Sequence, residues 1–207
     1  MIADGDASTD LLEALDDART PHGTVDNVMR VHSLRPNTMR GHVKLYRAVL
    51  HDDANSLPTW LQETIASYVS ILNDCAYSFG NHWANARHLI IDDRSPGDDH
   101  GDGSHGERAA RASDIEAALR DDAPERVFDG AELAMLHYAR KLTRTPGAMT
   151  EADVLGMRAQ GVDDGQILEV NQIVGYFNYV NRLLNGLGVT LDGDIVGYYT
   201  KNEEQSA

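Results

Sequence analysis

Apolar residues recur at spacings of three and four along most of this chain, and no segment alternates convincingly between apolar and polar residues. A spacing of three and four places side chains on one face of an α-helix, whereas alternation would indicate a β-strand. The helical spacing is clear from Pro36 to Leu50 and from Leu57 to Leu72. We therefore predict an all-α fold, a bundle of six to eight helices without a β-sheet.

Residues that favour helix ends divide this pattern into separate helices. Asn73 or Asp74 can cap a helix that begins at Cys75 and runs to about Ile91. Further helices are predicted from Ser113 to Leu119, from Ala131 to Leu142, from a Thr150 cap with Asp153 to Gly161, and from Asp163 or Asp164 to the Gly186/Gly188 pair.

The composition divides the chain into three parts. Residues 1–24 form a polar, acidic N-terminal extension with room for one short helix. Residues 25–200 form the helical domain, and residues 201–207 form a tail. Within the domain, the stretch from Asp92 to Glu107 is rich in Gly, Asp and His, which indicates a mobile surface loop.

The charge and the cysteine content exclude several classes of protein. A net charge of −15 argues against nucleic acid and anionic membranes as partners, since both repel an acidic surface. No apolar run of about 18 residues predicts a membrane span, and the acidic N-terminus lacks the apolar core of a signal peptide. The single cysteine, Cys75, permits no intrachain disulfide. We expect a cytoplasmic protein that acts on a small molecule.

Three chemically active residues share one face of the helix predicted to begin at Cys75. At 100° per residue, Ser78 and His82 lie at about 300° and 340° from Cys75, so the three span roughly 60°. The first turn of a helix favours an anion, so we expect a lowered pKa for the Cys75 thiol. His82 can accept or return a proton, and Ser78 can relay a hydrogen bond between them.

A carboxylate on the preceding helix completes the candidate site. Glu63 has apolar neighbours at Leu61, Ile65 and Ala66, which favours an inward side chain. A buried carboxylate needs a partner, and an imidazole or a thiol on the next helix would supply one. A Glu–His pair beside a cysteine has the parts of a proton relay.

Each of these residues also has a structural interpretation. Cys75 would then be an inert buried thiol, His82 a hydrogen-bonded interior histidine, Glu63 a partner for a helix end, and Ser78 a space-filling residue. The acidic string from Asp98 to Gly103 resembles a calcium loop, but Ala109 stands where the bidentate Glu is needed. We expect no metal and no cofactor.

The spacing Glu63-x11-Cys75-x2-Ser78-x3-His82 resembles the Glu-x11-Cys-x2-Cys-x3-His signature of the alkylhydroperoxidase D and carboxymuconolactone decarboxylase superfamily. Three further stretches look like the peroxidase-related branch of that superfamily: MRVHSLRPNTMRGHVKLYRAVL near the start, and LTRTPGAMTEADVLGMRAQGVDDGQILEV and VGYFNYVNRLLNGLGV in the C-terminal half. The resemblance covers residues 25–196. It implies an AhpD-like helical bundle that forms homo-oligomers.

The resemblance also implies roles for the four residues. In the family, the cysteine next to the histidine attacks a peroxide, the first cysteine resolves the product into a disulfide, and Glu and His pass protons. Glu63 and His82 would then be the relay and Cys75 the resolving thiol. Ser78 occupies the attacking position. Because a hydroxyl cannot form a sulfenic acid, the dithiol cycle cannot run in this chain.

Three functional hypotheses follow. The first is an alkylhydroperoxidase-like oxidoreductase in which Cys75 is the single reactive cysteine, an external thiol is the reductant, and Glu63 and His82 move protons. The second is a non-redox enzyme of the carboxymuconolactone decarboxylase type, with Glu63 and His82 as acid and base on a small carboxylate or lactone. The third is a catalytically silent oligomeric protein.

Overall fold

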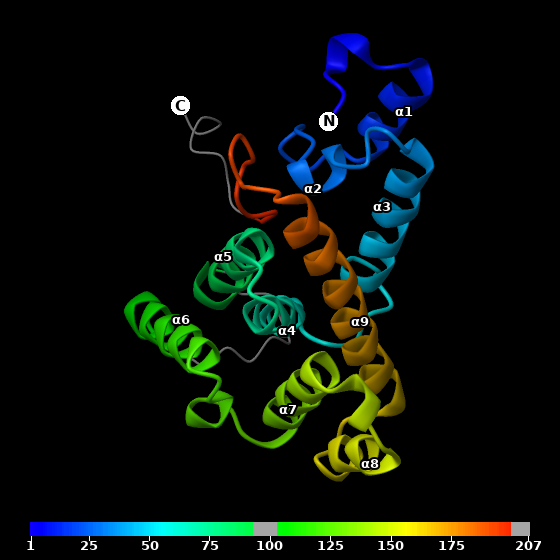
Figure 1. Cartoon of the computed structure of the whole chain (residues 1–207). Helices are drawn as coiled ribbons and strands as arrows, with labels where there is room; N and C mark the ends of the chain where they lie inside the picture. Colours follow the sequence, from blue (N-terminus) through cyan, green and yellow to red (C-terminus); the bar gives the residue numbers. More distant parts are fainter. Residues whose placement is uncertain (93–102, 200–207) are drawn as a thin grey trace.

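The computed structural model describes residues 1–92 and 103–199 (Figure 1). Within these residues the chain forms nine α-helices, three short 3-10 turns and no β-strand, which confirms the predicted all-α class. The α-helices are α1 Thr9–Asp17, α2 Asn27–Arg30, α3 Pro36–Leu50, α4 Thr59–Leu72, α5 Ala76–Asp92, α6 His105–Arg120, α7 Gly130–Arg144, α8 Glu151–Ala159 and α9 Asp164–Leu187. No helix in these two ranges combines the length and the apolar character that crossing a membrane requires.

Helix α4 is the centre of the bundle, packed against α5, α7 and α9. Every residue from Trp60 to Ser70 is buried, including several polar side chains. The buried hydroxyls of Thr64, Ser67 and Ser70 each donate to the carbonyl four residues earlier, at 2.7, 2.7 and 2.8 Å. These bonds remove the cost of leaving a buried hydroxyl unpaired, so a helix with this sequence can be enclosed on all sides.

Most of the predicted helix ends are confirmed. The Thr150–Asp153 pair forms a capping box at the start of α8. Asp163 caps α9 in the same way with Gln166, and Gly188 ends that helix with a φ of 62°. These ends depend on hydrogen bonds between residues a few positions apart, which is why the sequence predicts them well.

The boundary between α4 and α5 differs from the prediction. Asn73 ends α4, because its N–H still bonds to the Val69 carbonyl at 3.1 Å, and Asp74 turns the chain with a φ of 51°. Cys75 is the residue that caps α5, since its carbonyl accepts the N–H of Phe79 at 3.0 Å. A two-residue turn is enough to reverse the chain here.

The predicted loop from Asp92 to Glu107 is only partly covered by the structure, because residues 93–102 lie outside the described ranges. Its last part is helical rather than a loop. Ser104 and Glu107 form a capping box, and α6 begins at His105. The correction has a local cause, since Ser followed three residues later by Glu is a strong helix-start signal.

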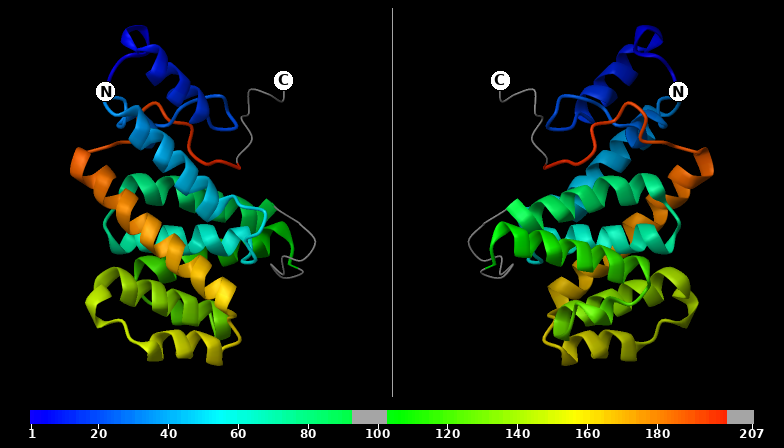
Figure 2. Two further views of the ribbon diagram at one scale, coloured as in Figure 1. Left: turned by 90° about the vertical axis from the view of Figure 1, so that its right-hand side faces the viewer. Right: turned by 90° about the vertical axis from the view of Figure 1, so that its left-hand side faces the viewer.

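The N-terminal segment, residues 1–30, packs against the rest of the bundle. Helix α1 lies beside α3, and the two enclose a small apolar cluster that is separate from the main core (Figure 2). This cluster consists of Leu11, Ala14, Leu15, Ala18, Val25, Met29, Met39 and Val43. The final segment, residues 188–199, runs between the N-terminal segment and α5 (Figure 2). The N-terminal segment and residues 188–199 therefore meet at one end of the bundle.

Two neighbouring leucines of α1 test this packing. Leu11 is 1% exposed and Leu12 is 48% exposed. We expect Leu11→Ala to lower the free energy of unfolding by about 2–4 kcal/mol, because it leaves a cavity in the small cluster. Leu12→Ala should change it by less than about 0.5 kcal/mol. Equilibrium urea unfolding of both variants measures the difference, and equal effects would show that α1 does not pack as described.

Candidate active site

The structure joins two of the four predicted site residues directly. Helices α4 and α5 form a hairpin that places Glu63 opposite His82. The Nδ1 atom of His82 lies 2.6 Å from Oε2 of Glu63. The amide of Asn85 donates to the other carboxylate oxygen, Oε1, at 3.2 Å. Glu63 is fully buried, and both of its oxygens have a partner.

These contacts orient the imidazole ring. Because Nδ1 is bound to Glu63, Nε2 remains to face whatever enters the site. The ring of Phe177 on α9 packs edge-on against His82, with the two centroids 4.6 Å apart. A carboxylate on one ring nitrogen and an aromatic ring at the side hold His82 in one orientation, as an orienting carboxylate does in catalytic triads.

Asn85 is a site residue that the sequence analysis missed. Its Oδ1 accepts the backbone N–H groups of Tyr198 and Tyr199, while its amide binds Glu63. It therefore connects the Glu63–His82 pair to the C-terminal segment. A signal was present in the sequence, since Asn85 lies three residues after His82 and seven after Ser78, on the same helix face.

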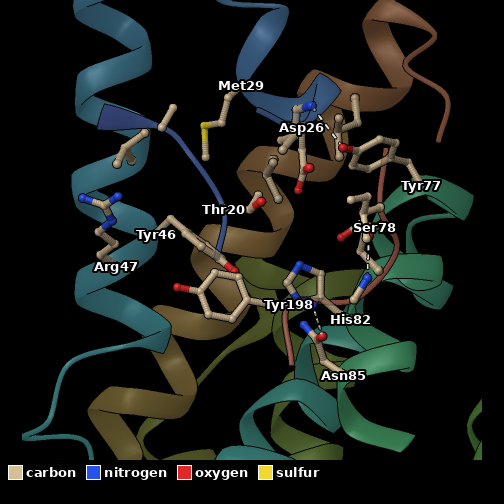
Figure 3. A pocket seen from close by; sticks show the side chains of 18 of the residues that line it. Thr20, Asp26, Met29, Tyr46, Arg47, Tyr77, Ser78, His82, Asn85 and Tyr198 are labelled. Carbon is tan, nitrogen blue, oxygen red and sulfur yellow. Dashed lines mark hydrogen bonds between the residues drawn. The ribbon is translucent and has the colours of Figure 1, made fainter. Parts of the chain in front are cut away.

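His82 opens into a cavity of about 90 Å³ (Figure 3). Four parts of the chain line it besides α5: the N-terminal segment, α3, α9 and the C-terminal segment. The residues from these parts include Thr20, His22, Asp26, Tyr46, Arg47, Tyr176, Val180, Ile195 and Tyr198. The cavity is thus closed by the two ends of the chain, which the sequence analysis did not connect to the site.

Ser78 and Cys75 have different positions relative to the cavity. Ser78 lies in its wall, and its hydroxyl oxygen is within hydrogen-bonding distance of the Ser70 hydroxyl, at 2.9 Å. Cys75 does not line the cavity and is 1% exposed. The position that the resemblance assigns to the attacking residue is therefore the one that faces the cavity, and in this chain it holds a hydroxyl.

The surroundings of Cys75 argue against its expected activation. Burial raises the pKa of its thiol, and hydrogen bonds from the backbone N–H groups of Ser78 and Tyr77 only partly offset this. The cap position does supply the N–H groups that favour a thiolate. The enclosure of the sulfur removes more stabilisation by water than these two bonds return.

Asp26 is a second residue that the sequence did not indicate. It lies in the roof of the cavity, with its carboxylate directed inward (Figure 3). Its Oδ1 atom is buried without a hydrogen-bond partner. Burial and the nearby Asp194 raise the pKa of Asp26 to about 6, with a small opposing effect of His22. Asp26 belongs to a polar stretch without periodicity, so nothing in the sequence marked it.

Metal binding finds no support among the described residues. No three His, Cys, Asp or Glu side chains in residues 1–92 and 103–199 gather closely enough to hold a metal ion. The string from Asp98 to Asp102 lies outside these ranges.

The fold has clear counterparts among solved structures. An uncharacterised peroxidase-related protein from Silicibacter sp. TM1040 is 24% identical, with a TM-score of 0.64 over 81% of this chain and 77% of that one. A second protein, from Ralstonia eutropha JMP134, is described as an alkylhydroperoxidase AhpD core and an uncharacterised peroxidase-related protein. It is 22% identical, with a TM-score of 0.63 over 88% of this chain and 85% of that one. This chain has the alkylhydroperoxidase D-like fold.

The same fold carries another activity. The debrominase Bmp8, solved as a cysteine-to-alanine variant in complex with 2,3,4-tribromopyrrole, is 14% identical, with a TM-score of 0.65 over 93% of this chain and 90% of that one. No protein-family model and no curated protein matches the sequence. The alkylhydroperoxidase D-like fold therefore fixes the scaffold, and the chemistry has to be argued from the site.

The buried thiol makes a measurable prediction. We expect iodoacetamide to alkylate Cys75 at least about 100-fold more slowly in the folded chain than in urea, because only local opening exposes the sulfur. The midpoint of the rate against pH should lie above the ordinary value of about 8.5. Cys75 is the single cysteine, so mass spectrometry reports this site alone. A midpoint below that value would show an activated thiol.

The raised pKa of Asp26 leads us to expect an unusual dependence of folding stability on pH. Folding raises its pKa from 3.8 to about 6, so the folded state binds the proton more tightly, and above pH 6 the buried charge destabilises the fold. Asp26→Asn removes that charge and should raise the melting temperature at pH 7.5. The gain should shrink as the pH falls from 6 towards 3.8.

Asp53→Asn is the control for this prediction, because Asp53 is an exposed acid outside the cavity lining. Asp53→Asn removes the same formal charge and should leave the melting temperature nearly unchanged, both at pH 7.5 and below pH 6. A loss of stability in Asp26→Asn at pH 7.5 would contradict the burial of an unpaired carboxylate.

Proposed function

We propose that this protein is an enzyme that uses His82 as a general acid and base on a small molecule bound in the cavity. The observation that carries the proposal is the 2.6 Å bond between His82 Nδ1 and the buried Glu63 carboxylate, made by a histidine that lines the cavity. A base held in this way is ready to act without reorganising the protein.

The proposed step moves one proton. Nε2 of His82 takes a proton from the substrate, and the imidazolium that forms is stabilised by the carboxylate on Nδ1. The imidazolium exchanges this proton with solvent and returns a proton to the substrate, at the same carbon or at a different atom, so the enzyme is regenerated and the charge balances. Glu63 is fully buried, and His82 and Asn85 occupy its two carboxylate oxygens. It therefore does not reach the substrate and acts through His82 as a positioning residue.

The cavity wall next to His82 supplies polar contacts for the substrate. The hydroxyl of Ser78 lies four residues before His82 on α5 and faces the same space. The rings of Tyr46 and Tyr198 lie on the other side of the imidazole (Figure 3). A small molecule held between these groups is shielded from water, which strengthens its interaction with the Glu63–His82 pair.

The redox hypothesis is the second candidate. The solved proteins of the same fold that are described as peroxidase-related favour it. In that cycle Cys75 would attack a hydroperoxide, become a sulfenic acid and be restored by an external thiol. Against it stand the enclosure of Cys75, its raised pKa and its absence from the cavity wall. The acid–base proposal does not require Cys75 to become exposed, to ionise or to reach the cavity, so we place it first.

A homo-oligomer and a cytoplasmic location remain predictions from the sequence and the resemblance. The acid–base proposal depends on neither, because all the groups that it uses come from one chain.

Exchange of hydrogen for deuterium tests the proposed step. The protein is incubated in D₂O with small lactones, 2-oxo acids and aminoketones, and mass spectrometry follows deuterium uptake at carbon. We expect exchange into at least one class, and His82→Gln to slow it by about 10²–10⁴-fold, the range for a general base. Glu63→Gln should slow it by at least about tenfold, because the imidazole loses its charged partner.

Cys75→Ala is the matched control, since Cys75 caps the helix that carries His82 but lies outside the cavity wall. It should leave the exchange rate unchanged within about twofold. Exchange that survives His82→Gln, or that depends on Cys75, would sink the acid–base proposal. Thiol-dependent peroxide turnover lost in Cys75→Ala would put the redox hypothesis first.

A further inference from the structure

We propose that the cavity binds a small protonated amine, with the ammonium group on Asp26 and the carbon atoms between Tyr46 and Tyr198. This inference names the substrate class of the acid–base site and rests on that proposed function. It is carried by the hydrogen-bond acceptors of the cavity wall, by its aromatic rings and by the placement of its charges.

Asp26 offers an acceptor that the protein leaves unused. Its Oδ1 atom is enclosed and has no hydrogen-bond partner within the protein. Leaving a buried carboxylate oxygen unpaired is costly, so a ligand that donates to it gains the full value of a charge-assisted hydrogen bond. Figure 3 shows the carboxylate directed into the cavity, above Thr20 and opposite His82. The group that fits this position carries N–H donors and a positive charge.

The neighbours of Asp26 supply only part of that charge. Asp194 is occupied by the hydroxyl of Tyr77 at 2.5 Å and by the backbone N–H of Asn27 at 3.0 Å, and as an acid it adds negative potential. His22 lowers the pKa of Asp26, and its ring is hydrogen-bonded to the Gly197 carbonyl at 2.9 Å. The two acids together therefore favour a cation at this end of the cavity.

A second acceptor follows from the direction of a buried hydrogen-bond chain. Thr38 donates its only hydroxyl proton to the Arg35 carbonyl at 2.8 Å, so it must accept from His32 Nδ1 at 2.9 Å. His32 Nε2 then has to accept from His42 Nδ1 at 3.0 Å. His42 Nε2 is left as an acceptor for the hydroxyl of Tyr176 at 2.8 Å.

This chain requires both histidines to be neutral, and burial supports that, since it lowers the pKa of His32 and lowers that of His42 to about 4. The proton of the Tyr176 hydroxyl is therefore committed to His42. Tyr176 lines the cavity, and any polar contact that its oxygen makes with a ligand must be as an acceptor. Asp26 and Tyr176 thus both favour a ligand that donates.

The cationic side chains of the lining are engaged elsewhere. Arg47 donates to the carbonyl of Asp17 at 2.7 Å, and Arg19 donates to Asp16 at 2.8 Å and to the Gly23 carbonyl at 2.6 Å. Both arginines are exposed, so water and salt screen their charges more than the charge of the partly buried Asp26. The rings of Tyr46 and Tyr198 offer apolar contact to the carbon atoms of the ligand (Figure 3).

The size of the cavity limits the ligand. A cavity of about 90 Å³ is smaller than the engineered cavities of about 150 Å³ that bind benzene, so the ligand core has only a handful of non-hydrogen atoms. Three probes of matched size separate the alternatives: propylamine, which is protonated at neutral pH, 1-propanol, which is neutral, and propionate, which is an anion.

Binding is measured at pH 7.5 from the NMR shifts of the Asn85 side-chain amide and the Tyr198 backbone amide. We expect the Kd of propylamine to be at least about tenfold below those of 1-propanol and propionate. Asp26→Asn should raise the Kd of propylamine by about tenfold and leave that of 1-propanol within about twofold. Asp53→Asn, which removes a distant charge, should change neither.

Two outcomes overturn the inference: propionate binding as tightly as propylamine, or an unchanged propylamine Kd in Asp26→Asn. His82→Gln separates this result from the acid–base proposal, because it should keep propylamine binding within about threefold while deuterium exchange is lost. An amine preference without His82-dependent exchange would sink the proposed chemistry and keep the amine site. His82-dependent exchange without an amine preference would keep the proposed chemistry and sink the amine site.

Discussion

The site depends on one constraint: a buried carboxylate on the central helix must have hydrogen-bond partners. Glu63 is fully buried in the middle of α4, and a carboxylate in that position is stable only with partners on both oxygens. His82 and Asn85 supply them, and both project from α5. The α4–α5 hairpin therefore has one register that satisfies Glu63, and that register also points His82 into the cavity.

The same constraint extends to the ends of the chain. Asn85 binds Glu63 with its amide and the backbone of Tyr198 with its carbonyl, so the C-terminal segment is held against the site. That segment in turn holds the N-terminal segment, because Asp194 accepts the backbone N–H of Asn27 and Gly197 bonds to His22. Residues at both ends of the sequence thus close a cavity whose base is formed by the central hairpin.

The alkylhydroperoxidase D-like fold supports more than one chemistry, as the peroxidase-related proteins and the debrominase of the same fold illustrate. In this chain the sulfur is enclosed and a serine hydroxyl faces the cavity. The histidine and its carboxylate remain in contact. A scaffold that keeps the proton-transfer pair and encloses its only thiol is suited to acid–base chemistry, and the unpaired oxygen of Asp26 indicates which ligands it would favour.

The sequence by itself determined the all-α class and most helix ends, because helical period and capping depend on residues close together in the chain. It placed a partner for Glu63 on the next helix, but whether that partner was an imidazole or a thiol was decided only by the fold. It did not determine the protonation of Cys75, since the cap position favours a thiolate and only tertiary packing shows that burial outweighs it. It also left out Asp26, Tyr176 and Tyr198. These residues reach the cavity from α9 and from both ends of the chain, and only the folded structure brings such distant segments together.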